Sequence, residues 1–274
     1  MLAMSAGKNK IRLAVCGAGG RMGLRVIALA SERPEFQLVA AIDRHESPLM
    51  GLDAGSAAGS KSIGVKVSVA LDSPADVLID FSAPAATRKI VPVCADHNVA
   101  MVIGTTGLSQ EEHRLIDAAA KKVPILQASN TSLGVNVLLD VAAQVARQLG
   151  LDYDIELVEV HHNQKKDAPS GTALSVLERI CAATGREVDT ALVHGRHGSE
   201  VSRIPGSIGV HAVRMGDVVG EHTIYFSGPG ERIEIKHVAT TRDTFARGAL
   251  RAAEFISGRP PGRYTMADVL GLKA

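Results

Sequence analysis

The chain has 274 residues, of which 46% are hydrophobic and only 3% aromatic, and its net charge is +1. The scarcity of aromatic side chains argues against a stacking platform for single-stranded nucleic acid, and the balanced charge argues against a general affinity for polyanions. Three cysteines without metal-ligand spacing, and the lack of an apolar run of about 18 residues, predict no metal site and no membrane span.

Five short apolar runs occupy the first 131 residues, and we interpret them as buried strands. They lie at 11–16, 38–42, 77–81, 100–103 and 125–127. Helical spacing of apolar residues covers 21–32, 85–96 and 109–121. Ser109 and Glu112 form a capping box before the third helix, whereas residues 47–64, rich in Gly, Ser and Ala, indicate a surface loop. The alternation predicts an α/β domain with a Rossmann-type, doubly wound parallel sheet over residues 1–131.

After a further amphipathic helix at 134–148, the pattern changes to longer strands separated by turns. These strands lie at 154–161, 206–214, 221–226 and 232–238. We therefore predict a second, α+β domain with a mixed or largely antiparallel sheet over residues 132–241. A last helix at 243–257, capped by Asp243, is expected to return the segment 242–274 to the first domain. Seven of the ten histidines lie between His161 and His237, which places the proton chemistry in the second domain.

The cellular compartment is indicated by the N-terminus and the cysteines. Residues 1–10 carry two lysines and no apolar segment, so they indicate a loose tail rather than a secretory signal. Cys16 and Cys94 lie within apolar stretches and are expected to be small core residues. Unpaired cysteines fit a reducing environment, and we predict a cytoplasmic protein.

A glycine-rich turn follows the first predicted strand and consists of Gly17, Ala18, Gly19, Gly20, Arg21 and Met22. With Gly23 it fits the pattern GxxGxxG but not GxGxxG, because Met22 stands at the third glycine of the latter. Glycines at a helix N-terminus let backbone N–H groups approach a phosphate, so we predict dinucleotide binding. A tight strand-to-helix turn that binds no ligand is the alternative.

Asp43 supports the dinucleotide interpretation because it ends the second strand, 20 residues after Gly23. Its carboxylate can accept hydrogen bonds from the adenosine ribose hydroxyls, which favours NADH. The adjacent Arg44 can neutralise the 2′-phosphate of NADPH. We therefore expect NADH and NADPH both to bind, and the sequence does not rank them.

Residues 159–173 combine several titratable groups with a Pro-Ser-Gly-Thr turn that opens a helix. His161, His162, Lys165 and Lys166 follow one another closely at the end of a predicted strand. Proton-transfer groups beside a helix N-terminus that can bind an anion form the layout of an active site. The density of such groups disfavours the alternative of a solvated polar loop, although Lys166 alone is expected to be solvated.

In outline the stretch reads HHxxKxDAPSGTA, which resembles the signature of the dihydrodipicolinate reductases (4-hydroxy-tetrahydrodipicolinate reductases) of the diaminopimelate and lysine pathway. Further segments resemble that family in the same order along the chain, at 17–23, 102–107, 132–136 and 216–222. The resemblance covers nearly the whole chain, from about residue 11 onward.

The resemblance implies an NADH- or NADPH-dependent reductase, commonly a homotetramer formed through the second domain, whose substrate is a small cyclic dicarboxylate. Matched position by position, it implies that His161 and Lys165 supply protons and that the substrate contacts are His162, Gly171 and Thr172. Beyond the glycine turn, Asp43 and Arg44, the implied cofactor contacts are Gly104, Thr105, Thr106, Ala128, Ser129, Asn130 and Thr131. Thr131 departs from the family, in which an aromatic residue or Met is frequent at that position.

Two other functions remain open on the sequence alone. One is a related dinucleotide oxidoreductase, such as an aspartate dehydrogenase, and the stretch 159–173 argues against it. The other is a non-catalytic sensor of NAD(P), which would not require His161 and Lys165. Arg242 is open as well, since it is either an anion or cofactor partner or an exposed residue near the start of a helix.

Overall fold

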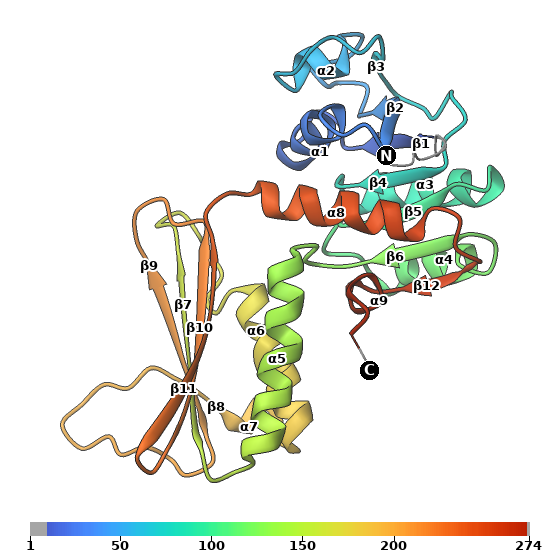
Figure 1. Ribbon diagram of the computed structural model, residues 1–274. Helices are drawn as coiled ribbons and strands as arrows, with labels where there is room; N and C mark the ends of the chain where they lie inside the picture. Colours follow the sequence, from blue (N-terminus) through green and yellow to red (C-terminus); the bar gives the residue numbers. More distant parts are fainter. Residues whose placement is uncertain (1–9, 273–274) are drawn as a thin grey trace, which may run out of the picture. The chain divides into compact units, whose positions relative to one another are not determined.

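The computed structural model describes residues 10–272, so the tail expected at residues 1–10 lies outside the described residues except for Lys10 (Figure 1). The chain forms two compact units. One joins the chain up to Ser132 with the segment from Asp243 onward, and the other is Leu133–Arg242. No helix in the described part is long and apolar enough to cross a membrane.

A seven-stranded sheet forms the centre of the first unit, and every neighbouring pair of its strands is parallel. In spatial order the strands are β12 (Gly262–Tyr264), β6 (Pro124–Gln127), β5 (Ala100–Ile103), β4 (Val77–Asp80), β1 (Ile11–Cys16), β2 (Phe36–Ile42) and β3 (Val67–Ser68). The strand order reverses at β1 and β4, and open α/β sheets bind ligands at the carboxyl ends of such a switch point. The predicted Rossmann-type sheet is confirmed, although the sequence patterns do not predict β3 and β12.

Helices cover both faces of this sheet (Figure 1). They are α1 (Arg21–Ser31), α2 (Ala54–Ala57), α3 (Pro84–Asp96), α4 (Gln110–Ala119), α8 (Asp243–Ile256) and α9 (Met266–Leu270). α1 and α8 pack against each other on one face, and α3 and α4 pack together on the other. Cys16 and Cys94 are buried in the core on the α3 and α4 side, as expected, whereas Asp243 lies in the first turn of α8 rather than before it.

Two local predictions in this unit have different outcomes. The capping box is confirmed, because the Glu112 side chain accepts the Ser109 N–H at 2.8 Å and the Ser109 hydroxyl caps the first turn of α4. The surface loop expected at 47–64 is wrong in part, because it contains α2. That short helix is stabilised by Asp53, whose carboxylate accepts the Ser56 N–H at 2.9 Å.

The second unit contains a mixed sheet, as predicted, but with five strands rather than the four that the sequence patterns indicate. In spatial order its strands are β11 (Glu231–Ala239), β10 (Gly220–Gly228), β7 (Asp154–His161), β9 (Ile208–Arg214) and β8 (Leu192–His194). β10 is antiparallel to both β11 and β7, whereas β9 is parallel to both β7 and β8. The helices α5 (Leu133–Leu149) and α6 (Gly171–Thr184) lie together over one face, and the short α7 (Val188–Ala191) follows α6.

Alternation along β7 decides which side chains face the helices. Ile155 and Leu157 are buried in the core with residues of α5 and α6, and Glu159 and His161 are buried in phase with them. Glu156, out of phase, is only partly buried. Because side chains of a strand point alternately to its two faces, a carboxylate and an imidazole extend the apolar row at the carboxyl end of β7.

Candidate active site

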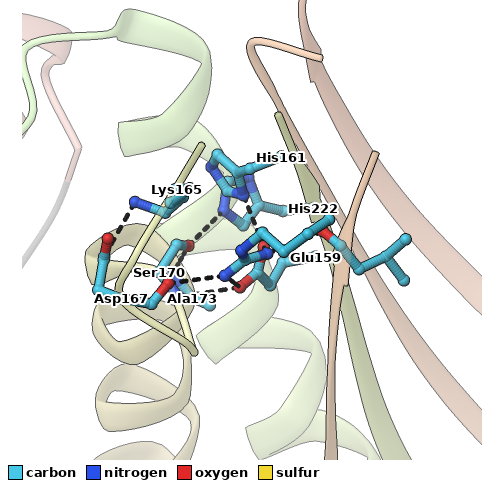
Figure 2. A network of polar contacts seen from close by, with 9 residues as sticks. Glu159, His161, Lys165, Asp167, Ser170, Ala173 and His222 are labelled. Atoms are coloured by element: carbon cyan, nitrogen blue, oxygen red, sulfur yellow. Dashed lines mark hydrogen bonds and ion pairs between the residues drawn. The ribbon is translucent and has the colours of Figure 1, made fainter. Parts of the chain in front are cut away.

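A buried carboxylate holds the imidazole of His161 at the end of β7 (Figure 2). His161 Nδ1 lies 2.5 Å from Glu159 Oε2. Burial lowers the pKa of His161 below its usual value, and the hydrogen bond with Glu159 offsets only part of that effect. Since Nδ1 faces the carboxylate, Nε2 is the nitrogen available for proton exchange. It lies beside Gly220, where an added Cβ would come within 3.0 Å of it.

Arg214 neutralises the carboxylate of Glu159. The register of β9 places Arg214 next to His161, and two guanidinium nitrogens each lie 2.7 Å from a Glu159 oxygen. Burial alone would raise the pKa of Glu159, but the hydrogen bonds from Arg214 and His161 outweigh it and lower that pKa. Glu159 is therefore ionised. Its Oε1 also accepts the backbone N–H of Ser170 at 3.0 Å, so one carboxylate links β7, β9 and the turn before α6.

Lys165 lies in the loop between β7 and α6, where its side chain is mostly shielded from solvent (Figure 2). Its Nζ is 2.9 Å from Asp167 Oδ2, and this contact lowers the pKa of Asp167. The backbone carbonyl of Asp167 accepts a hydrogen bond of 2.7 Å from Arg214, which ties the loop to the Glu159 network. His162 is partly buried, whereas Lys166 is exposed, as expected.

The N-terminus of α6 lies beside these groups. Ser170 caps it, because the Ser170 hydroxyl accepts the Ala173 N–H at 3.1 Å. Gly171 is exposed, and an added Cβ there would meet nothing within 4 Å, so open space lies before the first turn. Thr172, in the same turn, is partly buried. A helix of 14 residues carries partial positive charge at this end, so the turn suits an anion such as a carboxylate.

His222 belongs to the same cluster, although no sequence motif predicts a role for it. Its Nε2 is 3.0 Å from Ser170 Oγ, and its ring packs edge-on against that of His161, with ring centroids 5.2 Å apart. Burial lowers the pKa of His222 to about 4, so it is neutral near pH 7. The sequence motifs likewise predict no role for Glu159 and Arg214. The signal that finds all three is strand register, which sets His222 opposite Glu159 and Arg214 beside His161.

In the first unit, the predicted cofactor segments all follow the carboxyl ends of neighbouring strands. The glycine turn follows β1, residues 43–44 follow β2, residues 104–106 follow β5 and residues 128–131 follow β6. Within the turn, Gly17 and Ala18 are buried, Gly19 and Met22 are partly buried, and Gly20 and Arg21 are exposed. The topology therefore places these predicted segments at one edge of the sheet.

The geometry of the glycine turn fits a dinucleotide phosphate. A Cβ on Gly17 would lie 2.5 Å from the Phe81 carbonyl oxygen, and one on Gly23 would lie 2.1 Å from the Gly17 carbonyl oxygen. These contacts draw α1 tightly onto the turn. Within the described range, no side chain caps the start of α1, so the N–H groups of its first turn are not occupied by a side-chain cap and can meet a phosphate.

Asp43 is held in place by the turn itself. Its Oδ2 accepts hydrogen bonds of 2.9 Å from the Gly19 N–H and from the Ser47 hydroxyl, and its Oδ1 accepts the Arg44 N–H at 2.8 Å. A Cβ on Gly19 would lie 2.3 Å from Oδ2, so only glycine permits this approach. The Arg44 side chain is exposed. Oδ2 thus already accepts two hydrogen bonds, whereas Oδ1 keeps one acceptor site that a ribose hydroxyl can fill.

The remaining segments differ in exposure. Gly104 faces Phe81, whose ring an added Cβ would approach to 2.2 Å, and the Thr105 hydroxyl accepts the Ser82 N–H at 3.1 Å. Residues 81–82 thus belong to the same edge of the sheet, although no motif predicts a role for them. Thr106 and Ser129 are exposed, and Ala128 and Asn130 are partly buried. Thr131 is buried, and its hydroxyl donates to the Phe245 carbonyl at 2.7 Å.

Comparisons with known proteins find similarity to the same family of reductases over both units. Sequence profiles described as "Dihydrodipicolinate reductase, N-terminus" and "Dihydrodipicolinate reductase, C-terminus" match residues 11–131 and 134–270. A 4-hydroxy-tetrahydrodipicolinate reductase of Alkalilimnicola ehrlichii is 47% identical over 264 residues, 95% of this chain and 99% of that protein. One of Citrifermentans bemidjiense is 47% identical over 266 residues, 96% of this chain and 100% of that protein. The structure of dipicolinate-bound dihydrodipicolinate reductase from Paenisporosarcina sp. TG-14 is similar with a TM-score of 0.75 at 25% identity, covering 94% of this chain and 98% of that one.

Proposed function

The chain belongs to the dihydrodipicolinate reductase family, and we propose that it reduces 4-hydroxy-tetrahydrodipicolinate to tetrahydrodipicolinate in diaminopimelate and lysine biosynthesis. In this reaction the hydroxyl group leaves as water, and one hydride and one proton are added to the ring. One observation carries the proposal at the level of residues. The buried Glu159–His161 pair and Lys165 lie beside the N-terminus of α6, which combines proton exchange with anion binding.

The first unit is proposed to hold NADH or NADPH. A bound nicotinamide dinucleotide supplies the hydride. The start of α1 binds its pyrophosphate through backbone N–H groups, and Asp43 accepts hydrogen bonds from the adenosine ribose. Arg44 neutralises the 2′-phosphate when NADPH is bound. Residues 104–106 and 128–131 contact the nicotinamide half, because they follow the strands on the other side of β1 from Asp43.

The second unit is proposed to hold the cyclic dicarboxylate. One carboxylate accepts hydrogen bonds from the first turn of α6, at Gly171 and Thr172, where Gly171 leaves open space. His162 and the ammonium group of Lys165 hold the rest of the substrate. Fixing the ring at two points orients it for hydride and proton transfer and removes rotational freedom before the reaction.

His161 is proposed to donate the proton from Nε2. Burial keeps the pKa of His161 low in the free protein, and a bound dicarboxylate brings negative charge that raises it, so His161 takes up a proton as substrate binds. Lys165 is either the second proton donor or the cation that stabilises negative charge on the ring. Replacement by arginine separates these roles, because a guanidinium keeps the charge but does not release a proton near pH 7.

Oxidation of NADH and of NADPH, followed by absorbance, tests the function. The substrate is formed in place by condensing pyruvate with aspartate semialdehyde. We expect oxidation that requires both precursors, a loss of turnover in His161→Gln and Lys165→Ala, and normal turnover in the matched control Lys166→Ala, whose side chain is exposed. If Lys165→Ala turned over normally, the assigned role of Lys165 would be wrong. If the wild type bound the cofactor without oxidising it, the proposed reductase activity would be wrong, and the chain would be either a sensor of NAD(P) or an enzyme with another substrate.

We also propose that the chain forms a homotetramer through the second unit. Val213 on β9 and Val238 on β11, two strands that β7 and β10 separate, are 37% and 45% exposed, while Met215 just beyond β9 is 54% exposed. The proposal takes these exposed apolar side chains of the sheet as part of a subunit interface. Light scattering coupled to gel filtration measures the assembly, and Val213→Lys with Val238→Lys is expected to shift it to a smaller species.

A further inference from the structure

We propose that Glu159 is a positioning residue that fixes the tautomer of His161 and, through its second oxygen, holds the anion-binding turn of α6 in register with that imidazole. This inference rests on the proposed function and goes beyond it, because Glu159 itself touches no substrate in the scheme above. Four hydrogen bonds converge on its two oxygens: His161 Nδ1 at 2.5 Å, Ser170 N at 3.0 Å and two from Arg214 at 2.7 Å.

The tautomer follows from the chemistry of the four contacts. An ionised carboxylate only accepts hydrogen bonds, so the nitrogen of His161 that faces it must carry the proton. Neutral His161 is therefore protonated at Nδ1 and presents a lone pair at Nε2. That nitrogen gains a proton when the imidazolium forms and releases it to the substrate. Arg214 keeps Glu159 ionised in a buried position, where an unpaired carboxylate would otherwise take up a proton.

The second oxygen extends the effect to the substrate turn. Oε1 accepts the Ser170 N–H, and Ser170 is the cap of α6 and a partner of His222. A shift of Glu159 would therefore move the proton donor and the anion-binding N–H groups together. Arg214 also connects the loop to Glu159, because it donates a hydrogen bond to the carbonyl of Asp167, whose side chain contacts Lys165. In metal sites, contacts that orient a functional histidine in this way contribute on the order of 10- to 100-fold to activity, and we take that range as the guide here.

Glu159→Gln is the discriminating substitution because it keeps size and one acceptor oxygen. The amide oxygen can still accept from Ser170, which preserves the turn. The amide nitrogen then faces His161 and donates to Nδ1, which reverses the tautomer and leaves Nε2 protonated in the neutral ring. The same nitrogen no longer accepts from Arg214, which keeps its hydrogen bonds to the other oxygen and to the Asp167 carbonyl. We expect kcat to fall on the order of 10- to 100-fold with little change in KM for the dicarboxylate.

The pH dependence gives a readout that simple structural damage would not produce. The charged and titratable groups around His161 are Glu159 on its own strand, Arg214 on β9, His222 on β10 and Lys165 in the following loop. Among them only Glu159 favours the imidazolium, so its removal lowers the pKa of His161 further. The alkaline limb of the kcat profile, on which the proton donor is lost, is expected to move to lower pH.

Glu156→Gln is the matched control. Glu156 lies on the same strand and also binds a histidine and two arginines, with its Oε2 2.7 Å from His211 Nε2, but it is on the opposite face of β7. This substitution is expected to leave kcat and its pH profile unchanged. A Glu159→Gln variant with the kcat, KM and pH profile of the wild type would overturn the proposal.

Nitrogen NMR of histidine-labelled wild type tests the tautomer independently of turnover. The neutral His161 ring, assigned by its loss in His161→Gln, is expected to carry its proton on Nδ1. Protonation at Nε2 would overturn the positioning role even if the enzyme is active. Protonation at Nδ1 in a protein without reductase activity would support the positioning geometry while refuting the proposed function, so the two failures are distinguishable.

Discussion

Burial of His222 is expected to make the folded protein sensitive to mild acid, and His222→Gln should remove the part of that sensitivity that His222 contributes. The ring is only 3% exposed, its Nε2 contacts Ser170, and its Nδ1 has no hydrogen-bond partner among residues 10–272. Burial lowers its pKa to about 4, so protonation is much less favourable in the folded than in the unfolded chain. Glutamine keeps a polar group near Ser170 but does not titrate.

The magnitude follows from proton linkage. An unfolded histidine has a pKa of about 6.5, so between about pH 6.5 and about pH 4 the unfolded chain binds more protons than the folded one. Stability due to His222 is therefore complete above about pH 6.5 and declines as pH falls towards about 4. Between about pH 7 and about pH 5 the loss amounts to about 2 kcal/mol. His161 and His237, whose pKa values burial also lowers, contribute to both proteins and cancel in the comparison.

Urea unfolding followed by circular dichroism, at one protein concentration and at two pH values near 7 and 5, measures the effect. The variant is expected to be less stable than the wild type near pH 7, because it loses the packing of the ring on His161. Its further loss on acidification should be smaller than that of the wild type by about 2 kcal/mol. Equal losses in the two proteins would refute the reasoning that burial of His222 opposes its protonation.

Gly248→Ala should lower the thermal midpoint of the first unit, because the added Cβ would lie 1.7 Å from the Thr131 carbonyl oxygen. Forcing such a contact costs about 1–3 kcal/mol, and calorimetry measures the loss of stability. Ser109→Ala removes the capping box of α4, and urea unfolding should show a loss of about 1 kcal/mol. Arg44→Ala should raise KM for NADPH more than KM for NADH in steady-state kinetics, and an equal rise would assign Arg44 no part in 2′-phosphate recognition. Binding of a cyclic dicarboxylate analogue of the proposed substrate near pH 7 should take up protons at His161, which titration calorimetry in two buffers of different ionisation enthalpy detects as a buffer-dependent heat.

Strands that bury both faces could be predicted from the sequence, and short edge elements could not. The runs at 77–81 and 100–103 are almost wholly apolar because β4 and β5 are covered by helices on both faces. β12, with the sequence Gly-Arg-Tyr, carries no such pattern and exists because its backbone pairs with β6 at the edge of the sheet. β3 is equally short and pairs with the end of β2. Pairing of this kind depends on tertiary contacts, which no local window of sequence contains.

The candidate site likewise has a part that the sequence predicts and a part that depends on tertiary contacts. The glycine turn and the stretch 159–173 are contiguous, so their spacing alone predicts a site. Arg214 and His222 lie 53 and 61 residues beyond His161 in the chain, and only the register of β9 and β10 against β7 brings them together. The segment 216–222 resembles the family, but without that register nothing in the sequence assigns a role to its last residue, His222.

One physical argument would nevertheless have pointed to the missing groups. Along β7 the apolar phase Ile155, Leu157 continues into Glu159, so an acidic residue stands where the pattern requires a buried one. A buried carboxylate is unstable without hydrogen-bond donors. On its own strand only His161, two residues on, offers a donor on the same face, so the remaining donors must come from adjacent strands. The position of Glu159 therefore predicts a cationic hydrogen-bond donor on an adjacent strand, and Arg214 on β9 is that donor. The same argument applies to other strands. A charged residue in phase with a buried apolar row predicts an oppositely charged residue on the next strand, and such a pair is a candidate functional site.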